Sequence, residues 1–340
     1  MKYNYAVYVG RYQPFHNEHK ATLDYALTKA ANVIIVLGSY KAARNIKNPW
    51  TAEEREIMIR SCYDINVNDR LHFVYVRDHF YSENKWIAEV QNKVYEITGP
   101  TNMKTCIVGY EKDDSSYYLH SFPQWNLLER VVRNPISATD IRNDIFSKSI
   151  PEQSFKQYVP KNVFGILCQF IFDPLYAELC KEYDFIQNYK KQWENSPYQP
   201  TFVTTDAVVV RSGHVLVIKR KFAPGKGLWA LPGGFVNPGE KIIDSAIREL
   251  KEETKILFPV RDLYKAIKEQ EVFDYPDRSL RGRTITHAYF INLGNGELPQ
   301  IKGADDAEKA KWMTFQELYE NEDKFYEDHH QIIQYFINKV

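Results

Sequence analysis

Two histidines near the start of the chain have the spacing of an anion-binding pair. They lie in GRYQPFHNEHK, residues 10 to 20, between a strand-like segment and a helix-like one. His16 and His19 are three residues apart, so at a helix start they share a face beside free backbone N–H groups and the positive end of the helix dipole. This spacing predicts an anion site with two tunable donors, although such a pair is by itself also typical of ordinary packing.

A second segment, ISATDIR at residues 136 to 142, supplies further groups of the same kind. Ser137 and Thr139 place hydroxyls near a predicted helix N-terminus, and Arg142 adds a bidentate guanidinium. These groups suit the outer phosphates of a nucleotide. The alternative is an ordinary capped surface helix.

A third segment, GGFVNPGEKIIDSAIRELKEETKI at residues 233 to 256, has carboxylates at helical spacing. Glu249, Glu252 and Glu253 stand at positions i, i+3 and i+4, on one face of a helix. Like charges together need a cation, and hard oxygen ligands select Mg²⁺ or Mn²⁺, which activate water and neutralise a diphosphate. A solvated Glu-rich face is the alternative, but the Gly/Pro turn before the helix, with Glu240 and Arg248 at fixed offsets, favours a metal site.

The first half of the chain alternates strands and helices. Residues 5–10 and 32–38 are strand-like, and 19–31 and 51–63 are helix-like, the last opened by the capping box of Thr51 and Glu54. Such alternation predicts βαβ units around a parallel sheet, with ligands at the carboxyl ends of the strands.

The second half has a different pattern, an α+β one. The segments TFVTTDAVVV, HVLVIKR, WALPGGFV and RTITHAYFINL are strand-like and surround one strong helix at about 242–255. A polar helix that ends in two prolines separates the halves. We therefore predict domains at 1–185 and 201–340 with a linker at 186–200.

Composition restricts the class of protein. The 340 residues include 44 Lys and Arg against 44 Asp and Glu, so no cationic field favours nucleic acid or an anionic membrane. The start of the chain has no signal-peptide pattern, and no apolar run reaches about 18 residues. The four cysteines form no Cys-x-x-Cys pair, which indicates reduced thiols in a cytoplasmic protein.

GRYQPFHNEH together with ISATDIR resembles the HxGH nucleotidyltransferase superfamily, which has a Rossmann-like α/β fold. GSY at 38–40, NPWTAEER at 48–55 and GYEKDDSSYYLHSFPQW at 109–125 resemble the archaeal-type nicotinamide mononucleotide (NMN) adenylyltransferases. The resemblance implies transfer of AMP from ATP to NMN, giving NAD and pyrophosphate, with Mg²⁺ accompanying ATP. It also implies an oligomer.

The resemblance implies roles for individual residues. His16, His19 and Arg142 would be catalytic, while ATP and NMN would be bound by Gly10, Arg11, Ser137, Thr139, Asn84 and Trp86. Trp86 is the candidate to stack on nicotinamide, with core packing as the alternative. Glu18 departs from the family pattern, which has Gly before the second histidine.

Residues 233–256 resemble the Nudix box, which implies an α/β/α sandwich and metal-assisted hydrolysis of a nucleoside diphosphate linked to another group. Glu249, Glu252 and Glu253 would bind Mg²⁺ or Mn²⁺, the last two being catalytic. Lys255 departs from the box, where Gly is usual, and a helix-ending Gly favours left-handed geometry.

RSLRGRTITHAYF at 278–290 and GADDAEKAKW at 303–312 resemble ADP-ribose pyrophosphatases. The resemblance implies hydrolysis of ADP-ribose to AMP and ribose 5-phosphate, with Gly234, Arg281 and Arg283 as ligand-binding residues. The sequence does not choose a general base among four candidates, which are Glu240, Glu253, Asp305 and Asp306. The alternatives are a sensor that binds ADP-ribose or NAD without hydrolysis, and another nucleoside diphosphate as substrate.

Overall fold

The computed structural model of the chain describes residues 2–99, 104–110, 118–132, 136–147, 154–303 and 307–339. These residues fall into two compact units, Met1–Tyr183 and Asp184–Val340. The boundary lies within helix α7 (Pro174–Lys191), so the first six residues of the predicted linker are helical.

Unit 1 contains a five-stranded parallel sheet in the order β3-β2-β1-β4-β5. The strands are β1 (Tyr3–Gly10), β2 (Ala30–Leu37), β3 (Leu71–Tyr75), β4 (Thr105–Gly109) and β5 (Asn126–Glu129). Most residues of β1 and β2 are buried, because helices cover both faces of a parallel sheet. The predicted βαβ architecture is confirmed.

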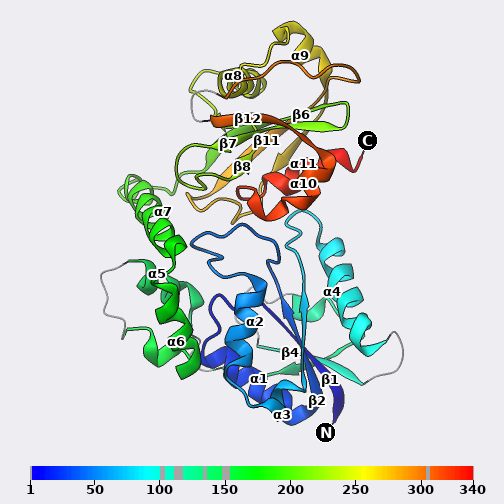
Figure 1. Cartoon of the computed structure of the whole chain (residues 1–340), viewed down its shortest axis with the longest axis vertical. Coiled ribbons are helices and arrows are strands. Elements are labelled where there is room, and N and C mark those ends of the chain that lie inside the picture. The colour runs from blue at the N-terminus through cyan, green and yellow to red at the C-terminus, as the bar shows by residue number, and fades with distance from the viewer. Residues whose placement is uncertain are drawn as a thin grey trace. The chain divides into compact units, whose positions relative to one another are not determined.

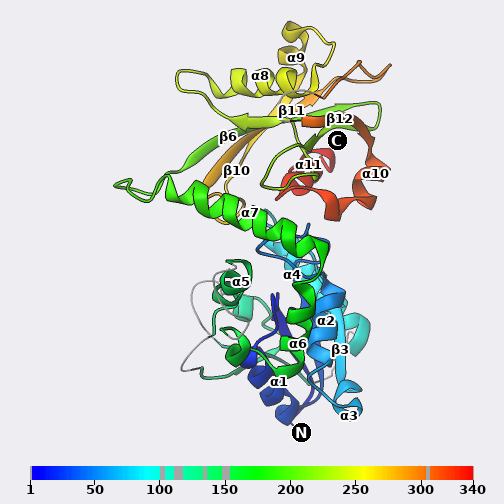
Figure 2. The same ribbon diagram turned by 60° about the vertical axis from the view of Figure 1, so that its left-hand side comes forward.

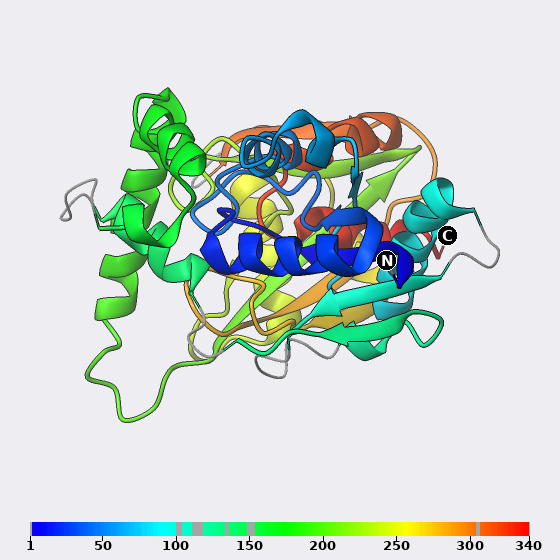
Figure 3. The ribbon, with the colours of Figure 1, turned by 90° about the horizontal axis from the view of Figure 1, so that it is seen from below.

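The helices of unit 1 form two layers (Figure 1). The helices of one layer bury apolar side chains, among them Leu23 and Met58, in one cluster on one face of the sheet. On the opposite face, α4 (Glu83–Thr98) packs through Val90 and Val94. The first layer includes α1 (Asn17–Lys29), the long dark-blue helix of Figure 3, with α2 (Ala52–Arg60), α5 (Ala138–Phe146) and α6 (Lys161–Phe170). Short helices α3 (Ile65–Asn68) and η2 (Lys156–Tyr158) complete the unit.

Unit 2 is built on a mixed sheet whose main path runs β10-β11-β6-β7-β12. These strands are β6 (Phe202–Arg211), β7 (His214–Arg220), β10 (Ile267–Phe273), β11 (Thr284–Asn292) and β12 (Ala307–Thr314). The predicted strand at WALPGGFV is instead two short strands, β8 (Trp229–Ala230) and β9 (Gly233–Phe235). Since β8 pairs with β7 and β9 with β6, the Leu231–Pro232 step between them changes the partner strand.

Helices cover both faces of this sheet (Figure 2). On one face, α8 (Ile242–Thr254) and α9 (Val260–Ala266) bury Leu250 and Leu263 against Val209 and Ile291. On the other, α11 (His329–Ile337) stacks Phe336 on Phe290 of β11, with ring centroids 5.5 Å apart. Short helices α10 (Phe315–Glu320) and η3 (Glu322–Lys324) precede α11. The arrangement is an α/β/α sandwich, as predicted.

No single helix in the described ranges is long and apolar enough to cross a membrane. Helices α6 and α7 pass such a test only together, and they are bent by 84° where they meet. Val163, Leu167 and Phe170 of α6 are buried in the core of unit 1.

A buried ion pair stabilises unit 2. Arg278 donates to both carboxylate oxygens of Asp328 at 2.8 Å, and the two side chains are 3% and 0% exposed. Removing one partner leaves an uncompensated charge in the interior, which costs far more than the loss of a surface pair.

We predict that Asp328→Ala lowers the free energy of unfolding of unit 2 by about 3–5 kcal/mol. The matched variant Asp323→Ala removes an exposed carboxylate of η3 and should stay within about 0.5 kcal/mol of the parent. Denaturant titration and calorimetry would each measure the stability of the two variants. Equal free energies of unfolding for the two variants would contradict a structural role for the pair.

Candidate functional sites

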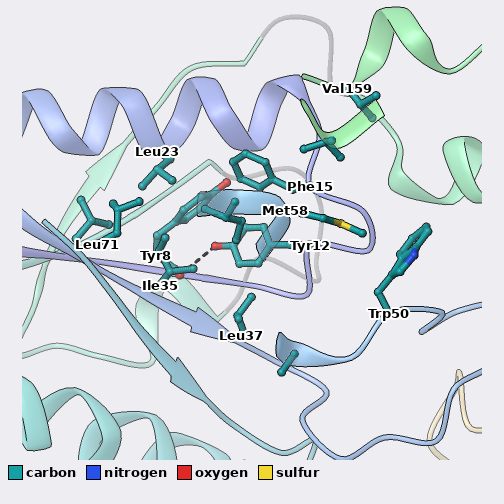
Figure 4. Close-up of a cluster of buried hydrophobic side chains, with 14 of the residues drawn as sticks. Tyr8, Tyr12, Phe15, Leu23, Ile35, Leu37, Trp50, Met58, Leu71 and Val159 are labelled. Atoms are coloured by element: carbon teal, nitrogen blue, oxygen red, sulfur yellow. Dashed lines mark hydrogen bonds between the residues drawn. The ribbon is translucent and has the colours of Figure 1, made fainter. Parts of the chain in front are cut away.

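The first candidate site is built on the turn that follows β1. Tyr12 adopts a left-handed conformation, with φ of 52°, and its hydroxyl donates to the Tyr8 carbonyl at 3.0 Å (Figure 4). Its ring packs so closely on Gly10 that a Cβ there would lie 2.8 Å from the ring. Gly10 therefore shapes the turn through packing, and the ligand-binding role predicted for it stays a prediction.

His16 and His19 lie together at the start of α1, which begins two residues before the predicted helix. His16 is the N-cap: its Nδ1 accepts from the His19 N–H at 3.4 Å, and the His19 Nδ1 accepts from the His16 N–H at 3.3 Å. Their rings stack with centroids 3.5 Å apart. Because each Nδ1 is an acceptor, we assign the protons of the neutral rings to Nε2, and the His19 ring also has a hydrogen bond with the backbone of Pro14.

The electrostatics of this pair favour the neutral form. Burial lowers the pKa of His19 well below its ordinary value, and the neighbouring His16 lowers it further. Protonating the closely stacked rings would place like charges together in a poorly solvated site. His19 is therefore neutral at neutral pH, and the roles predicted for the two histidines stay predictions.

Arg142 joins three segments that are distant in sequence. It donates to the carbonyls of Gln13 at 2.6 Å and Ile46 at 3.1 Å, and to the hydroxyl of Thr139 at 3.0 Å. Gln13 in turn exchanges hydrogen bonds with the backbone of Trp50. Ser137 caps α5 by accepting from the Asp140 N–H. The 10–20 and 136–142 segments, each predicted to bind phosphate, thus lie in contact, and Arg142 positions the backbone through these bonds.

The departure at Glu18 has a local partner. Its carboxylate accepts from Arg130 Nη1 at 2.8 Å, and the same nitrogen donates to Thr22. Arg130 follows β5, and its N–H donates to the carbonyl of Gly109 at the end of β4. Glu18 therefore connects α1 to the carboxyl end of the sheet.

Two predicted ligand-binding residues lie on α4. Trp86 is half-buried, with its ring 5.8 Å from that of Phe122 and 6.1 Å from that of Tyr118. Asn84, two residues earlier, is exposed. The structure gives Trp86 a packing role, and the stacking role predicted for it stays a prediction.

The second candidate site is centred on Arg248 of α8. Its guanidinium binds both oxygens of Glu240, at 2.8 and 3.0 Å, and donates from Nη1 to Glu249 at 2.7 Å and Glu252 at 2.9 Å. It also donates to the carbonyl of Phe235 at 3.3 Å. One cation thus orients three carboxylates.

The glycine turn approaches the carboxylates closely. Glu253 is buried and accepts from the Gly233 N–H at 3.0 Å, while a Cβ on Gly234 would lie 2.5 Å from a Glu249 oxygen. Burial raises the pKa of Glu249, against the lowering by Arg248. The low pKa of Glu240, about 2, results chiefly from its hydrogen bonds with Arg248.

Hard carboxylate oxygens suit a divalent cation, and those of Glu249, Glu252 and Glu253 lie on one helix. In the part of the chain that the structure describes, no three His, Cys, Asp or Glu groups converge as a ligand set. Arg248 Nη1 bonds to both Glu249 and Glu252, so it supplies the cation between them. The donor chemistry fits a metal, and the predicted ligand set stays a prediction.

The two predicted ligand-binding arginines differ in their partners. The guanidinium of Arg281 lies 4.9 Å from the ring centroid of Phe235, directly after the glycine turn, so it is close to the Arg248 cluster. Arg283 binds Asp274 through its backbone carbonyl and carboxylate. Asp305 and Asp306, two candidate general bases, lie outside the described residues.

Sequence reasoning missed Gln13 and Arg55. Both are buried polar residues that connect the loops of the first site, and Arg55 donates to the carbonyls of Arg11 and Gly38. A Gln between Tyr12 and Pro14 in an otherwise apolar turn was an available signal. Nothing in the sequence distinguished Arg55 from a surface arginine of a charged helix.

The two folds and their sites indicate that the chain joins a nucleotidyltransferase-type domain to a Nudix-type domain. The Cytidylyltransferase-like family model matches residues 7–144, and the NUDIX domain model matches residues 200–336. The chain belongs to the family of bifunctional NMN adenylyltransferase/ADP-ribose pyrophosphatases.

A solved structure and two relatives establish this membership. The bifunctional NMN adenylyltransferase/ADP ribose pyrophosphatase of Francisella tularensis, solved with AMP and a Mn ion, is 37% identical over 99% of each chain, with a TM-score of 0.93. The nicotinamide/nicotinic acid mononucleotide adenylyltransferase of Acinetobacter baylyi is 37% identical over 54% of this chain and 94% of its own length. The ADP-ribose pyrophosphatase of Methanocaldococcus jannaschii is 37% identical over 38% of this chain and 70% of its own length.

The departure at Lys255 does not change how α8 ends. Lys255 is the C-cap, with φ of 45° and ψ of 31°, in the left-handed region that Gly usually occupies. Lys251 compensates by donating to the carbonyls of Ile256 at 2.6 Å and Phe258 at 3.3 Å.

We predict that Lys255→Gly raises the free energy of unfolding of unit 2 by about 1 kcal/mol, because Gly adopts this backbone conformation without strain. Lys255→Ala keeps the Cβ and should give no such gain. Denaturant unfolding of both variants checks this, and a gain in the alanine variant alone would show that the side chain, not the backbone, is strained.

Proposed function

We propose that the first domain transfers AMP from ATP to NMN, giving NAD and pyrophosphate, and that the second hydrolyses ADP-ribose to AMP and ribose 5-phosphate. The observation on which the first activity chiefly depends is the convergence of His16, His19 and the Arg142-linked segments beyond the carboxyl end of β1. The names of the relatives similar to each half support both activities.

In the first reaction an oxygen of the NMN phosphate attacks the α-phosphorus of ATP, and pyrophosphate leaves. This step needs no protein nucleophile, so catalysis depends on positioning and neutralising the phosphates. Arg11, which is exposed beside the turn, would bind phosphate directly. His16 and His19 would donate from Nε2, and Arg142 would hold the loops in register. Asn84 and Trp86 are proposed for the nicotinamide end.

In the second reaction the diphosphate of ADP-ribose is cleaved by water. Glu249, Glu252 and Glu253 would hold a divalent cation, for which we propose Mg²⁺, with Mn²⁺ as a substitute. Such a cation would supply activation of water and neutralisation of the diphosphate. Arg248 orients the carboxylates, and the close approach of Gly234 lets backbone reach the same point. Arg281 would bind the ligand beside Phe235, and Arg283 is proposed for its outer part.

Lys255 is the one sequence feature that favours the sensor alternative, but it ends α8 in the left-handed geometry that a helix-ending Gly usually adopts. That feature therefore no longer favours binding without hydrolysis. We assign the first activity to residues 1–185 and the second to 201–340, connected by 186–200. None of the four cysteines, all of which the structure describes, is part of a disulfide, and this supports the proposal of a reducing, cytoplasmic location.

The purified chain with ATP, NMN and Mg²⁺ should form NAD and pyrophosphate, and with ADP-ribose and Mg²⁺ it should form AMP and ribose 5-phosphate. Chromatography of the products with ³¹P NMR checks both reactions. Turnover of another acceptor in place of NMN, or tight binding of ADP-ribose without cleavage, would contradict the corresponding half of the proposal.

Two single variants should separate the activities. Glu252→Gln should lower ADP-ribose hydrolysis by about a hundredfold or more and leave NAD synthesis within twofold, because a neutral amide is a poor metal ligand. His19→Ala should lower NAD synthesis and leave ADP-ribose hydrolysis within twofold, since it removes a group that donates a hydrogen bond to phosphate in the first site.

The matched control is Glu320→Gln, which removes an exposed carboxylate of α10 and should change neither rate. Steady-state kinetics of both reactions would be measured on each variant. Loss of both activities in a folded Glu252→Gln protein would contradict independent sites.

A further inference from the structure

Arg55 of α2 is a fully buried cation whose side chain binds only backbone carbonyls. Its Nε donates to Thr51 at 3.0 Å, and its Nη1 donates to Arg11 at 2.5 Å and to Gly38 at 2.8 Å. Its Nη2 is buried and has no hydrogen-bond partner. The side chain is 0% exposed, so no ligand touches it in this conformation.

The carbonyls that Arg55 binds lie at the carboxyl ends of the two central strands. Arg11 follows β1 and Gly38 follows β2, and the Gly38 N–H donates to the Gly10 carbonyl at 3.0 Å. The Arg11 side chain lies over Gly38, since a Cβ there would be 3.6 Å from Arg11 Cγ. Arg55 therefore lies directly beneath the turn that presents Arg11.

The charge of Arg55 has no local counter-ion. Among the described residues, no carboxylate lies within 4.0 Å of Arg11, Arg55 or Arg142. Burial lowers the pKa of Arg55 to about 10, an effect that Asp78 and Glu53 oppose and that Arg11 adds to. The group is thus protonated at neutral pH, and nearby carboxylates act on it only from beyond ion-pair distance. Within the described residues, the same absence of a carboxylate in direct contact holds for Arg11 and Arg142.

A structural role explains only part of this arrangement. Neutral donors would satisfy the Arg11 and Gly38 carbonyls without the cost of burying a charge and leaving one of its nitrogens unbonded. A fixed charge in a poorly solvated site acts strongly on anions that bind nearby, because little water screens it. The turn above it is where the proposed function places the phosphates of ATP.

We propose that Arg55 is a positioning residue of the first site that also supplies a fixed positive charge to the nucleotide phosphates without contacting them. The inference rests on the proposed nucleotidyl transfer only in placing those phosphates beside Arg11. Its distinguishing consequence is that the effect of Arg55 on affinity increases with the number of phosphate charges on the ligand.

The test measures displacement of a fluorescent ATP analogue from the full chain by adenosine, AMP and ADP, in EDTA so that metal does not contribute. In Arg55→Gln, which keeps an amide donor without charge, the affinity for ADP should fall about tenfold more than that for adenosine, with AMP between them. Arg55→Lys, which keeps the charge, should hold the ADP-to-adenosine ratio within about threefold of the parent.

The matched control is Arg70→Gln. Arg70 likewise donates to backbone carbonyls, those of Leu27, Ala30 and Ala31, but at the amino end of β2. This variant should lose stability and leave the ratio unchanged. Arg55→Met supplies a second uncharged variant if Arg55→Gln does not fold.

Equal weakening of adenosine, AMP and ADP in a folded neutral variant would overturn the proposal and leave Arg55 a structural residue. NAD formation by the parent protein is measured separately. Its absence would contradict the proposed function, whereas a charge-independent loss of affinity would contradict this inference alone.

Discussion

Both candidate sites gather groups of like charge in a chain whose formal net charge is zero. In the first, Arg11, Arg55 and Arg142 have no carboxylate partner in the described residues. In the second, Glu240, Glu249 and Glu252 share the single cation Arg248. Like charges held together in a folded protein are destabilising unless a ligand of opposite charge joins them. The rest of each unit can be understood as the framework that imposes this arrangement.

The framework of the first site is mostly backbone. The parallel strands end at one edge, and Gln13, Arg55 and Arg142 bind the carbonyl or N–H groups of the loops that follow. In the second site the framework is helix α8 with the glycine turn of β9 pressed against it. The proposed function assigns phosphates to the first site directly and to the second site through a divalent cation. On this proposal, a neutral chain acts on anions at two places by two different means.

Sequence patterns predicted the parts of this arrangement that depend on local spacing. The capping box of Thr51 and Glu54 is present, and both fold classes and the helix with three carboxylates on one face are as expected. The long-range contacts were not predictable. The bond from Arg142 to Gln13 joins residues 129 positions apart, and the partner of Glu18 is 112 positions away. The mutual capping of His16 and His19 depends on where the helix begins, which periodicity does not define to the residue.

The central claim is that the α8 carboxylates bind a divalent cation. Arg248 orients these carboxylates but does not replace that cation. The claim is tested most directly by titrating the nucleotide-free chain with Mn²⁺ and following free Mn²⁺ by electron paramagnetic resonance. The account predicts saturable binding by the parent chain that is lost when Glu249, Glu252 and Glu253 are all replaced by Gln. Binding of equal strength in the triple variant, or no binding by the parent chain, would contradict it.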